Sequence, residues 1–302
     1  MGGLLGCVQR RSWENEMTER LSEKFKLAEA MRALGFLLEG FVPDLGIVLG
    51  SGMGHITDLL EGGQSCRFED IPNCPTPTVE GHAGTFHWGW MAGLPVVIAS
   101  GRVHLNEGYG VQEVAFMTRL MIMLGAEVVI QTHAVGSLTL NLVPGDVVLV
   151  RSQNGLYCPD PTSGRDALEL STSSFTTMES VHDTGLIEMA MQVGLRTGVS
   201  VHRGVSVFKM GRTFQTAAET HALAMVAQIV SMSVCAETMA TAHLGKRVLD
   251  IALVTDLCLG LGSTEPVDHK EVLRVVESMS GPFGRLIFSI VAGIGARKKL
   301  AS

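Results

Sequence analysis

Short apolar runs alternate along the chain with polar loops and with segments of helical periodicity. The apolar runs predict strands at Leu45–Leu49, Leu94–Ser100, Glu127–Gln131, Asp146–Arg151, Gly204–Met210, Val230–Ser233 and Val248–Thr255. The helical pattern predicts helices at Met17–Leu38, Val111–Leu124, Leu186–Leu195, Ala217–Gln228, a stretch through Ala242, and Glu271–Ile294. This repetition is typical of an α/β fold in which helices cover the faces of a mainly parallel or mixed sheet.

The helix caps, glycines, prolines and loops between these segments indicate one domain. Thr18 is the expected N-cap of the first helix, which Gly40 and Pro43 end. Glycines interrupt residues 78–84 too often for regular structure, and the polar stretch Ser152–Thr177 predicts a long excursion outside the sheet. Because neither a repeat nor a linker occurs, we expect residues 1–16 to form a mobile extension and residues 17–302 to form a single domain.

Composition narrows the class of partner. The 302 residues are 46% apolar and 18% charged, which is typical of a compact globular chain. A net charge of −7 argues against a nucleic-acid partner, and no run approaches the roughly 18 apolar residues of a membrane span. The six cysteines have no C-x-x-C spacing, which favours reduced thiols in a cytoplasmic protein and suggests no metal framework.

A glycine-rich turn follows the first predicted strand, at Val48–Gly54. Its alternating glycines allow a sharp bend that turns consecutive N–H groups toward one point, and Ser51 adds a hydroxyl donor. Such a turn suits an anion such as phosphate. A plain connection between a strand and a helix explains the same residues equally well, so the turn alone does not decide between the two.

Further polar groups stand at the ends of the other predicted strands: Arg102 with His104, His133 with Ala134, Ser233, and Asp256. If the strands are parallel, these groups converge on one rim of the sheet. Arg102 offers a fork for two anion oxygens, and Glu107 could favour protonation of His104. Singly, Arg102 also suits a solvated loop charge, His104 a buried imidazole with its own partner, and Ser233 a helix cap.

Seven stretches of the chain resemble the trimeric purine nucleoside phosphorylase family. They are GSGMG at 50–54, IPNCPTPTVEGHAG at 71–84, GRVHLNEGY at 101–109, VGSL with PGD between 135 and 146, TFQT at 213–216, SMSVCAE at 231–237 and VTD at 254–256. The resemblance implies a single α/β domain with a mixed, barrel-like sheet flanked by helices, and a homotrimer. It also implies phosphorolysis of purine (deoxy)ribonucleosides to the free base and (deoxy)ribose 1-phosphate, with inorganic phosphate as co-substrate and no metal or organic cofactor.

The same resemblance implies a role for each matched residue. The phosphate would lie against Ser51, Arg102, His104, Ala134 and Ser233, with His82 closing over it. Met232 would lie under the ribose and His269 would reach the 5′-hydroxyl. Phe214, Gln215 and Asp256 would face the purine. His104, Gln215, Asp256 and His269 would then be the catalytic residues.

This chain departs from the family at the residues that face the base. Members that act on 6-oxopurines carry Glu at the position of Gln215 and Asn at that of Asp256. An amide donates to the bare N1 of adenine, and a carboxyl accepts from its 6-amino group, which predicts a shift toward 6-aminopurines. The related methylthioadenosine phosphorylases also carry Asp at this strand end, but the retained His269 does not indicate their hydrophobic 5′ pocket.

Other departures favour a different class of function. Asn106 stands in place of a Tyr, His133 of an Asn, Ser137 of a Gly and Leu257 of a Lys, and the excursion Ser152–Thr177 lacks the family's usual sequence. These changes are compatible with a paralogue that binds nucleoside or phosphate with weak turnover or none. A nucleosidase that uses water is the third hypothesis. The complete set of anion donors favours the phosphorylase.

Overall fold

The computed structural model of the chain describes residues 22–301 except 165–168, 172–174, 259 and 262–267. The expected N-cap Thr18, the extension 1–16 and part of the excursion Ser152–Thr177 lie outside these residues. The strands are β1 (Leu45–Leu49), β2 (Glu61–Arg67), β3 (Thr85–Met91), β4 (Leu94–Ser100), β5 (Val128–Ser137), β6 (Val147–Asn154), β7 (Val201–Phe208), β8 (Ile229–Ser231) and β9 (Arg247–Leu257).

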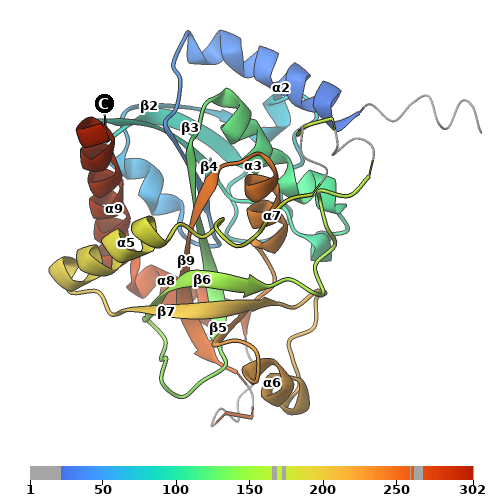
Figure 1. Cartoon of the computed structure of the whole chain (residues 1–302), viewed down its shortest axis with the longest axis vertical. Helices are drawn as coiled ribbons and strands as arrows, with labels where there is room; N and C mark the ends of the chain where they lie inside the picture. Colours follow the sequence, from blue (N-terminus) through green and yellow to red (C-terminus); the bar gives the residue numbers. More distant parts are fainter. Residues whose placement is uncertain (1–21, 165–168, 172–174, 259, 262–267, 302) are drawn as a thin grey trace, which may run out of the picture.

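Helices cover both faces of the sheet that these strands form. They are α2 (Glu23–Leu38), α3 (Val111–Leu124), α5 (Thr184–Thr197), α6 (Ala217–Ala224), α7 (Cys235–His243), α8 (His269–Ser278) and α9 (Ser280–Ala301), with short 3-10 helices η1 (Gly54–Leu59), η2 (Phe68–Asp70) and η3 (Leu105–Glu107). Figure 1 shows α5 and α9 on one side of the strands and α3 and α7 on the other. The predicted α/β class with a mixed, barrel-like sheet is confirmed.

The sheet closes on itself at one end. Its order is β2-β3-β4-β1-β5-β8-β7-β6-β9, and β9 also pairs with β5, so β5, β8, β7, β6 and β9 form a barrel. β1, β4, β5 and β9 are parallel, whereas β8 is antiparallel to β5 and β6 is antiparallel to β9. The polar strand ends therefore meet at one rim although the strands do not all run in the same direction. β8 comes to the shared rim from the opposite direction, through barrel closure.

Two apolar layers hold this sheet from its opposite faces. Successive β1 residues alternate between them, because side chains of a strand point to opposite faces. Ile47 lies in a cluster with Leu286 of α9 and Leu186 of α5, and Val48 lies in a second cluster with Leu120 of α3. Since both faces are buried, β1 reads as a continuous apolar run, and its end is fixed relative to the neighbouring strands.

Several element boundaries differ from the sequence prediction. The first helix begins at Glu23 in the described residues, and Ser22 caps it by accepting from the Phe25 N–H at 3.2 Å. The helix predicted to reach Gln228 ends at Ala224. Strand β9 runs to Leu257, so Asp256 lies within the strand instead of beyond it. Residues Ser152–Asn154 belong to β6 and not to the excursion.

The chain ends in two helices instead of the one predicted. α8 and α9 meet at an angle of 64° at Met279. Among the described residues no single helix is long and apolar enough to cross a membrane, although α8 and α9 taken together meet that test by length and composition. His269, the first residue of α8, lines the cavity described next.

Candidate active site

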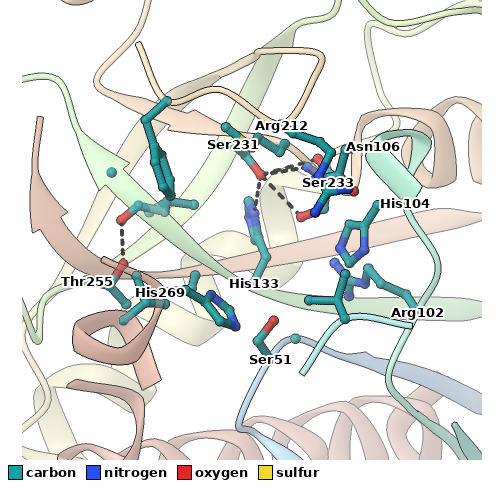
Figure 2. Close-up of a pocket in the computed structure, with 18 of the residues that line it drawn as sticks. Ser51, Arg102, His104, Asn106, His133, Arg212, Ser231, Ser233, Thr255 and His269 are labelled. Atoms are coloured by element: carbon teal, nitrogen blue, oxygen red, sulfur yellow. Dashed lines mark hydrogen bonds between the residues drawn. The ribbon is translucent and has the colours of Figure 1, made fainter. Parts of the chain in front are cut away.

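A cavity of about 520 Å³ lies where β1, β4, β5, β8 and β9 end or approach one another. All the site residues that the sequence predicted line this one cavity: Ser51, His82, Arg102, His104, Ala134, Phe214, Gln215, Met232, Ser233, Asp256 and His269. Figure 2 shows Ser51, Arg102, His104 and Ser233 around one part of it, with Thr255 farther away. The structure thus brings the predicted set together, while the role of each member remains a prediction.

The glycine turn after β1 places Ser51 at the floor of the cavity. Gly50 lies so close to β5 that a Cβ added there would be 2.9 Å from the His133 Cα, so only glycine fits without a shift. The Gly50 N–H donates to Thr132 Oγ1 at 3.1 Å, which fixes the turn to that strand. Ser51 Oγ then lies 3.1 Å from His82 Nε2.

Arg102 is buried, and the alternative of a solvated loop charge is wrong. Its side chain is 3% exposed, and its Nη2 donates to the carbonyls of Thr132 at 2.8 Å and Val48 at 3.1 Å. Its Nε lies 3.4 Å from Glu237 Oε1 on α7. Nη1 has no hydrogen-bond partner among the described residues. Nε also makes no hydrogen bond with these residues, so Nη2 holds the guanidinium in place while Nε and Nη1 keep donor capacity, which suits an anion.

His104 is held by a carboxylate, as the sequence suggested. Glu107 Oε1 lies 2.8 Å from His104 Nδ1 and accepts from the His104 N–H at 2.7 Å. Burial raises the pKa of Glu107, but hydrogen bonds from His104 and Thr78 outweigh it and hold that pKa at about 2. The ionised carboxylate accepts from Nδ1, so the other ring nitrogen is available to a ligand.

His82 lines the part of the cavity that Ser51, Arg102 and His104 form, which we call the anion end, and it is neutral. Burial lowers the pKa of His82 to about 3, and the neighbouring His104 and Arg102 add to the effect. The rings of His82 and His104 are 5.1 Å apart between centroids. Gly101, with φ +114°, makes room for this contact, since a Cβ there would lie 2.8 Å from the His82 Cβ. An anion between these groups would favour the charged form of His82.

Ser233 is not a helix cap. The N-cap of α7 is Val234, which adopts φ 63° in the left-handed region that a β-branched residue rarely enters. The Ser233 hydroxyl instead lies 3.3 Å from Ser231 Oγ. Backbone strain of this kind is concentrated at functional sites, where the surrounding structure enforces it. Here the strained residue, Val234, connects the cavity-lining Ser233 to α7, whose Glu237 pairs with Arg102.

Gln215, Asp256 and Phe214 line the cavity with Thr255, which Figure 2 shows at the opposite end from Arg102 and His104. Thr255 Oγ1 donates to Asp256 Oδ1 at 3.0 Å. Burial raises the pKa of Asp256 to about 6, against the lowering effect of that bond. Burial also raises the pKa of the Cys258 thiol to about 12, with a contribution from Asp256 and an opposing hydrogen bond with Gln215. The buried thiol therefore links the two polar side chains of this end.

The middle of the cavity lies between these two ends. Met232 lines it between Ser231 and Ser233, and Asn106 adds an amide. His269 Nε2 lies 3.3 Å from the Glu80 carbonyl oxygen, so the ring bridges α8 and the irregular segment 78–84. Met232 offers an apolar surface beside polar groups, a combination that suits a sugar.

Sequence reasoning missed several residues that support this site. Glu237 pairs with Arg102, Ser231 contacts His133, Thr78 holds Glu107, and Arg212 lines the cavity. Glu237 had a weak signal, because it is the last residue of the SMSVCAE motif and lies in the first turn of a helix. Ser231 and Thr78 also lie within quoted motifs, but their partners His133 and Glu107 are distant in sequence, so their supporting roles were not visible. Within the described residues, no group of three or more His, Cys, Asp or Glu side chains is arranged to hold a metal ion.

The chain matches a known protein family over most of its length. The model of the phosphorylase superfamily matches residues 44–292. Purine nucleoside phosphorylase 1 of Bacillus subtilis is 32% identical over 264 residues, which cover 86% of this chain and 97% of that protein. Purine nucleoside phosphorylase of Rattus norvegicus is 29% identical over 264 residues, which cover 85% of this chain and 91% of that protein.

The solved structures agree. The crystal structure of Schistosoma mansoni purine nucleoside phosphorylase in complex with adenosine superposes with a TM-score of 0.82 at 28% identity, over 88% of this chain and 96% of that one. The chain therefore belongs to the phosphorylase superfamily. Within it, the chain is a member of the purine nucleoside phosphorylase family, a pentosyltransferase that acts on purine nucleosides.

Proposed function

We propose that this enzyme cleaves purine nucleosides with inorganic phosphate and prefers 6-aminopurines such as adenosine. One observation carries the proposal: the two ends of the cavity have opposite chemistry. The end around Arg102 offers a buried cation and neutral donors, whereas the end around Asp256 offers a carboxyl group whose pKa is raised to about 6. Phosphate suits the first end and a departing purine suits the second.

The bond-breaking step follows from this arrangement. A phosphate oxygen attacks C1′ of the sugar as the N-glycosidic bond breaks, which leaves positive charge on the sugar and negative charge on the base. Arg102, His104 and Ser51 position the phosphate, whose own charge stabilises the sugar cation. Asp256 in its acid form donates a proton to N7 of the purine and so stabilises the leaving group.

Asp256 and Gln215 also determine the base specificity. The protonated carboxyl donates through its O–H and accepts the 6-amino hydrogen through its carbonyl oxygen, so adenine satisfies both oxygens. A 6-oxopurine offers two acceptors, N7 and O6, and leaves one carboxyl oxygen facing another oxygen. The Gln215 amide donates to the bare N1 of adenine. An unpaired group in a site of this kind costs about 1–3 kcal/mol, which is enough to set a preference.

The relatives support the reaction more than the preference. Solved structures of Schistosoma mansoni purine nucleoside phosphorylase have adenosine in one case and inosine in another. A cavity of this fold therefore accepts both kinds of purine in that protein, so the base-facing side chains of this chain carry the argument. The proposal keeps Met232 under the ribose and His269 near the 5′-hydroxyl.

The proposal includes two further expectations. Phosphate is a co-substrate, and neither a metal nor an organic cofactor takes part, so a chelator should leave the rate unchanged. We also propose a homotrimer, for which the strongly exposed Leu156 and Tyr157, 85% and 65% accessible, provide apolar surface. Light scattering on the purified protein measures that state directly.

Adenosine, inosine and guanosine incubated with and without phosphate test the function. We expect free base only when phosphate is present, and fastest from adenosine. Base release without phosphate would indicate a nucleosidase. Binding of nucleoside without base release over long incubation would indicate a non-catalytic paralogue. A strong preference for inosine would retain the reaction and reject the assigned role of Asp256.

A further inference from the structure

Three exposed arginines from three elements line one hollow on the outer surface. They are Arg196 at the end of α5, Arg203 of β7 and Arg297 near the end of α9, and the hollow measures about 540 Å³. Figure 1 shows α5 beside α9, with β7 following the end of α5. This hollow shares no lining residue with the active-site cavity. We call it the arginine hollow.

The three guanidinium groups have no carboxylate partner within the part of the chain that the structure describes. Arg196 and Arg203 make no hydrogen bond or ion pair there. Arg297 donates from Nη1 to the Gly185 carbonyl oxygen at 2.9 Å, which anchors its side chain to the start of α5. Like charges gathered without a counter-charge repel one another, so this arrangement does not stabilise the fold. It leaves donors and charge available to a ligand.

Helix ends explain part of this charge but not its placement. Arg196 lies in the last turn of α5, and Arg297 comes one residue before the last turn of α9, where basic side chains complement the helix dipole. A side chain that extends into solvent would serve that purpose equally well. Arg203 belongs to a strand and has no such role. A bound anion explains why all three side chains line the same hollow.

The positive charge here is local, because the chain as a whole carries a net charge of −7. Helix α9 contains basic residues but no Asp or Glu. Glu188 of α5 also lines the arginine hollow, but it forms no ion pair with the three arginines. The lining therefore keeps a surplus of positive charge, with one carboxylate that would repel an anion. This carboxylate provides a way to test where an anion binds.

A second hollow of about 880 Å³ adjoins the first, because Arg196 lines both. Arg285 and Phe288 of α9 line it too, and Phe288 is 37% exposed. Its floor is open at Gly284, where the nearest atom to an added Cβ would be His55 Cδ2 at 3.7 Å. His55 Nε2 has no hydrogen-bond partner among the described residues. An aromatic ring beside arginines suits a nucleotide, whose base stacks and whose phosphates bind guanidinium groups.

We propose that the arginine hollow binds a chain of phosphate groups, and that the adjoining hollow takes the base of a nucleoside triphosphate against Phe288. Three guanidinium groups on separate elements match several phosphates, whereas a single phosphate needs only one fork. The shared chemistry is the polyphosphate, and the two sources are a nucleotide and inorganic triphosphate. The inference is independent of the proposed function, because this site lies outside the active-site cavity.

Calorimetric titration of the full chain with inorganic triphosphate tests the arginine hollow. We expect Arg203→Gln to weaken binding about tenfold, because a charged donor is lost. Glu188→Gln should tighten binding severalfold, because it removes the repelling carboxylate. Arg67→Gln is the matched control and should change nothing, since Arg67 is exposed but already pairs with Glu69 at 2.7 Å. All four residues are exposed, and thermal melting of each variant confirms that it folds.

A second titration, with ATP, identifies the source of the polyphosphate. If the occupant is a nucleotide, ATP should bind roughly tenfold more tightly than triphosphate, and Phe288→Leu should remove that advantage. Equal affinity for both ligands would identify free polyphosphate and would keep the arginine site. Two results would overturn the proposal: wild type that does not bind triphosphate, or an affinity for triphosphate that neither Arg203→Gln nor Glu188→Gln changes. The second result would place the anion elsewhere, such as at Arg102.

Discussion

The two ends of the cavity differ in how their side chains are held. At the anion end, the two basic side chains have fixed partners. Arg102 contacts two carbonyl oxygens and Glu237, and His104 contacts Glu107. At the base end, Asp256 has one hydrogen bond from Thr255, and Phe214 is 47% exposed. The anion end is preorganised for one charge, whereas the base end can change its preference through one or two side chains.

Removal of the Arg102 charge should have the largest effect. We expect Arg102→Ala to lower kcat/KM for phosphate roughly a hundredfold, because a charged and buried donor is lost. This factor corresponds to about 3 kcal/mol of transition-state stabilisation. Initial rates over a range of phosphate concentrations measure this. Arg151→Ala, on the exposed part of β6, is the control. Unchanged phosphate kinetics would refute the assignment.

The same substitution leaves Glu237 buried without a partner, which is destabilising by about 3–5 kcal/mol. Arg102→Ala combined with Glu237→Ala removes both charges and should recover much of that loss. Urea unfolding of both variants separates the two effects. Recovery of activity together with stability would mean that Arg102 is structural only.

Asp256→Asn should change the choice of base. An asparagine amide donates to O6 and N7 acceptors, so we expect the ratio of kcat/KM for adenosine over inosine to fall by roughly a hundredfold. Phosphate KM should stay near the wild-type value, since the anion end is untouched. A proportional loss on both nucleosides would show that Asp256 contributes to catalysis without selecting the base.

The raised pKa of Asp256 predicts a pH dependence with a definite sign. Its acid form is the proposed donor, and its pKa is raised to about 6 by burial. At saturating phosphate, kcat/KM for adenosine should therefore be highest below pH 6 and fall by about tenfold per pH unit above it. This fall in rate above pH 6 should disappear in Asp256→Asn. A rate that rises between pH 6 and 8 would assign another group as the acid.

Glu107→Gln should have the smallest effect of this series. The amide oxygen still accepts from His104 but carries no charge, so we expect about a fivefold increase in phosphate KM. Glu113→Gln is a matched control, since Glu113 accepts from the N–H of Gly110 three residues earlier in the same way. Equal effects of both variants would show that the Glu107 bond serves only the local backbone.

The bounds of helices and strands were predicted best where a short stretch of sequence determines its own structure. The bounds of α3 and β4 match the prediction, because a continuous apolar helix and a buried strand carry their pattern locally. The hairpin of β2 and β3 was not predicted. Glu61–Arg67 is polar and exposed along its length, so it forms a strand only through its pairing with Thr85–Met91.

For the site, sequence revealed the residues that face the cavity but not those that hold them. Ser51, Arg102 and Ser233 follow strands and could be predicted as a set. The contact of Arg102 with Glu237 and that of His133 with Asp250 each cross more than a hundred residues of chain. Such pairs depend on barrel closure, which periodicity does not reveal.

Phosphorus NMR of the full chain incubated with adenosine and inorganic phosphate tests the central claim most directly. The account predicts that ribose 1-phosphate appears in step with free adenine, and faster than hypoxanthine appears from inosine under the same conditions. Adenine released with free ribose, or cleavage of inosine faster than that of adenosine, would contradict it.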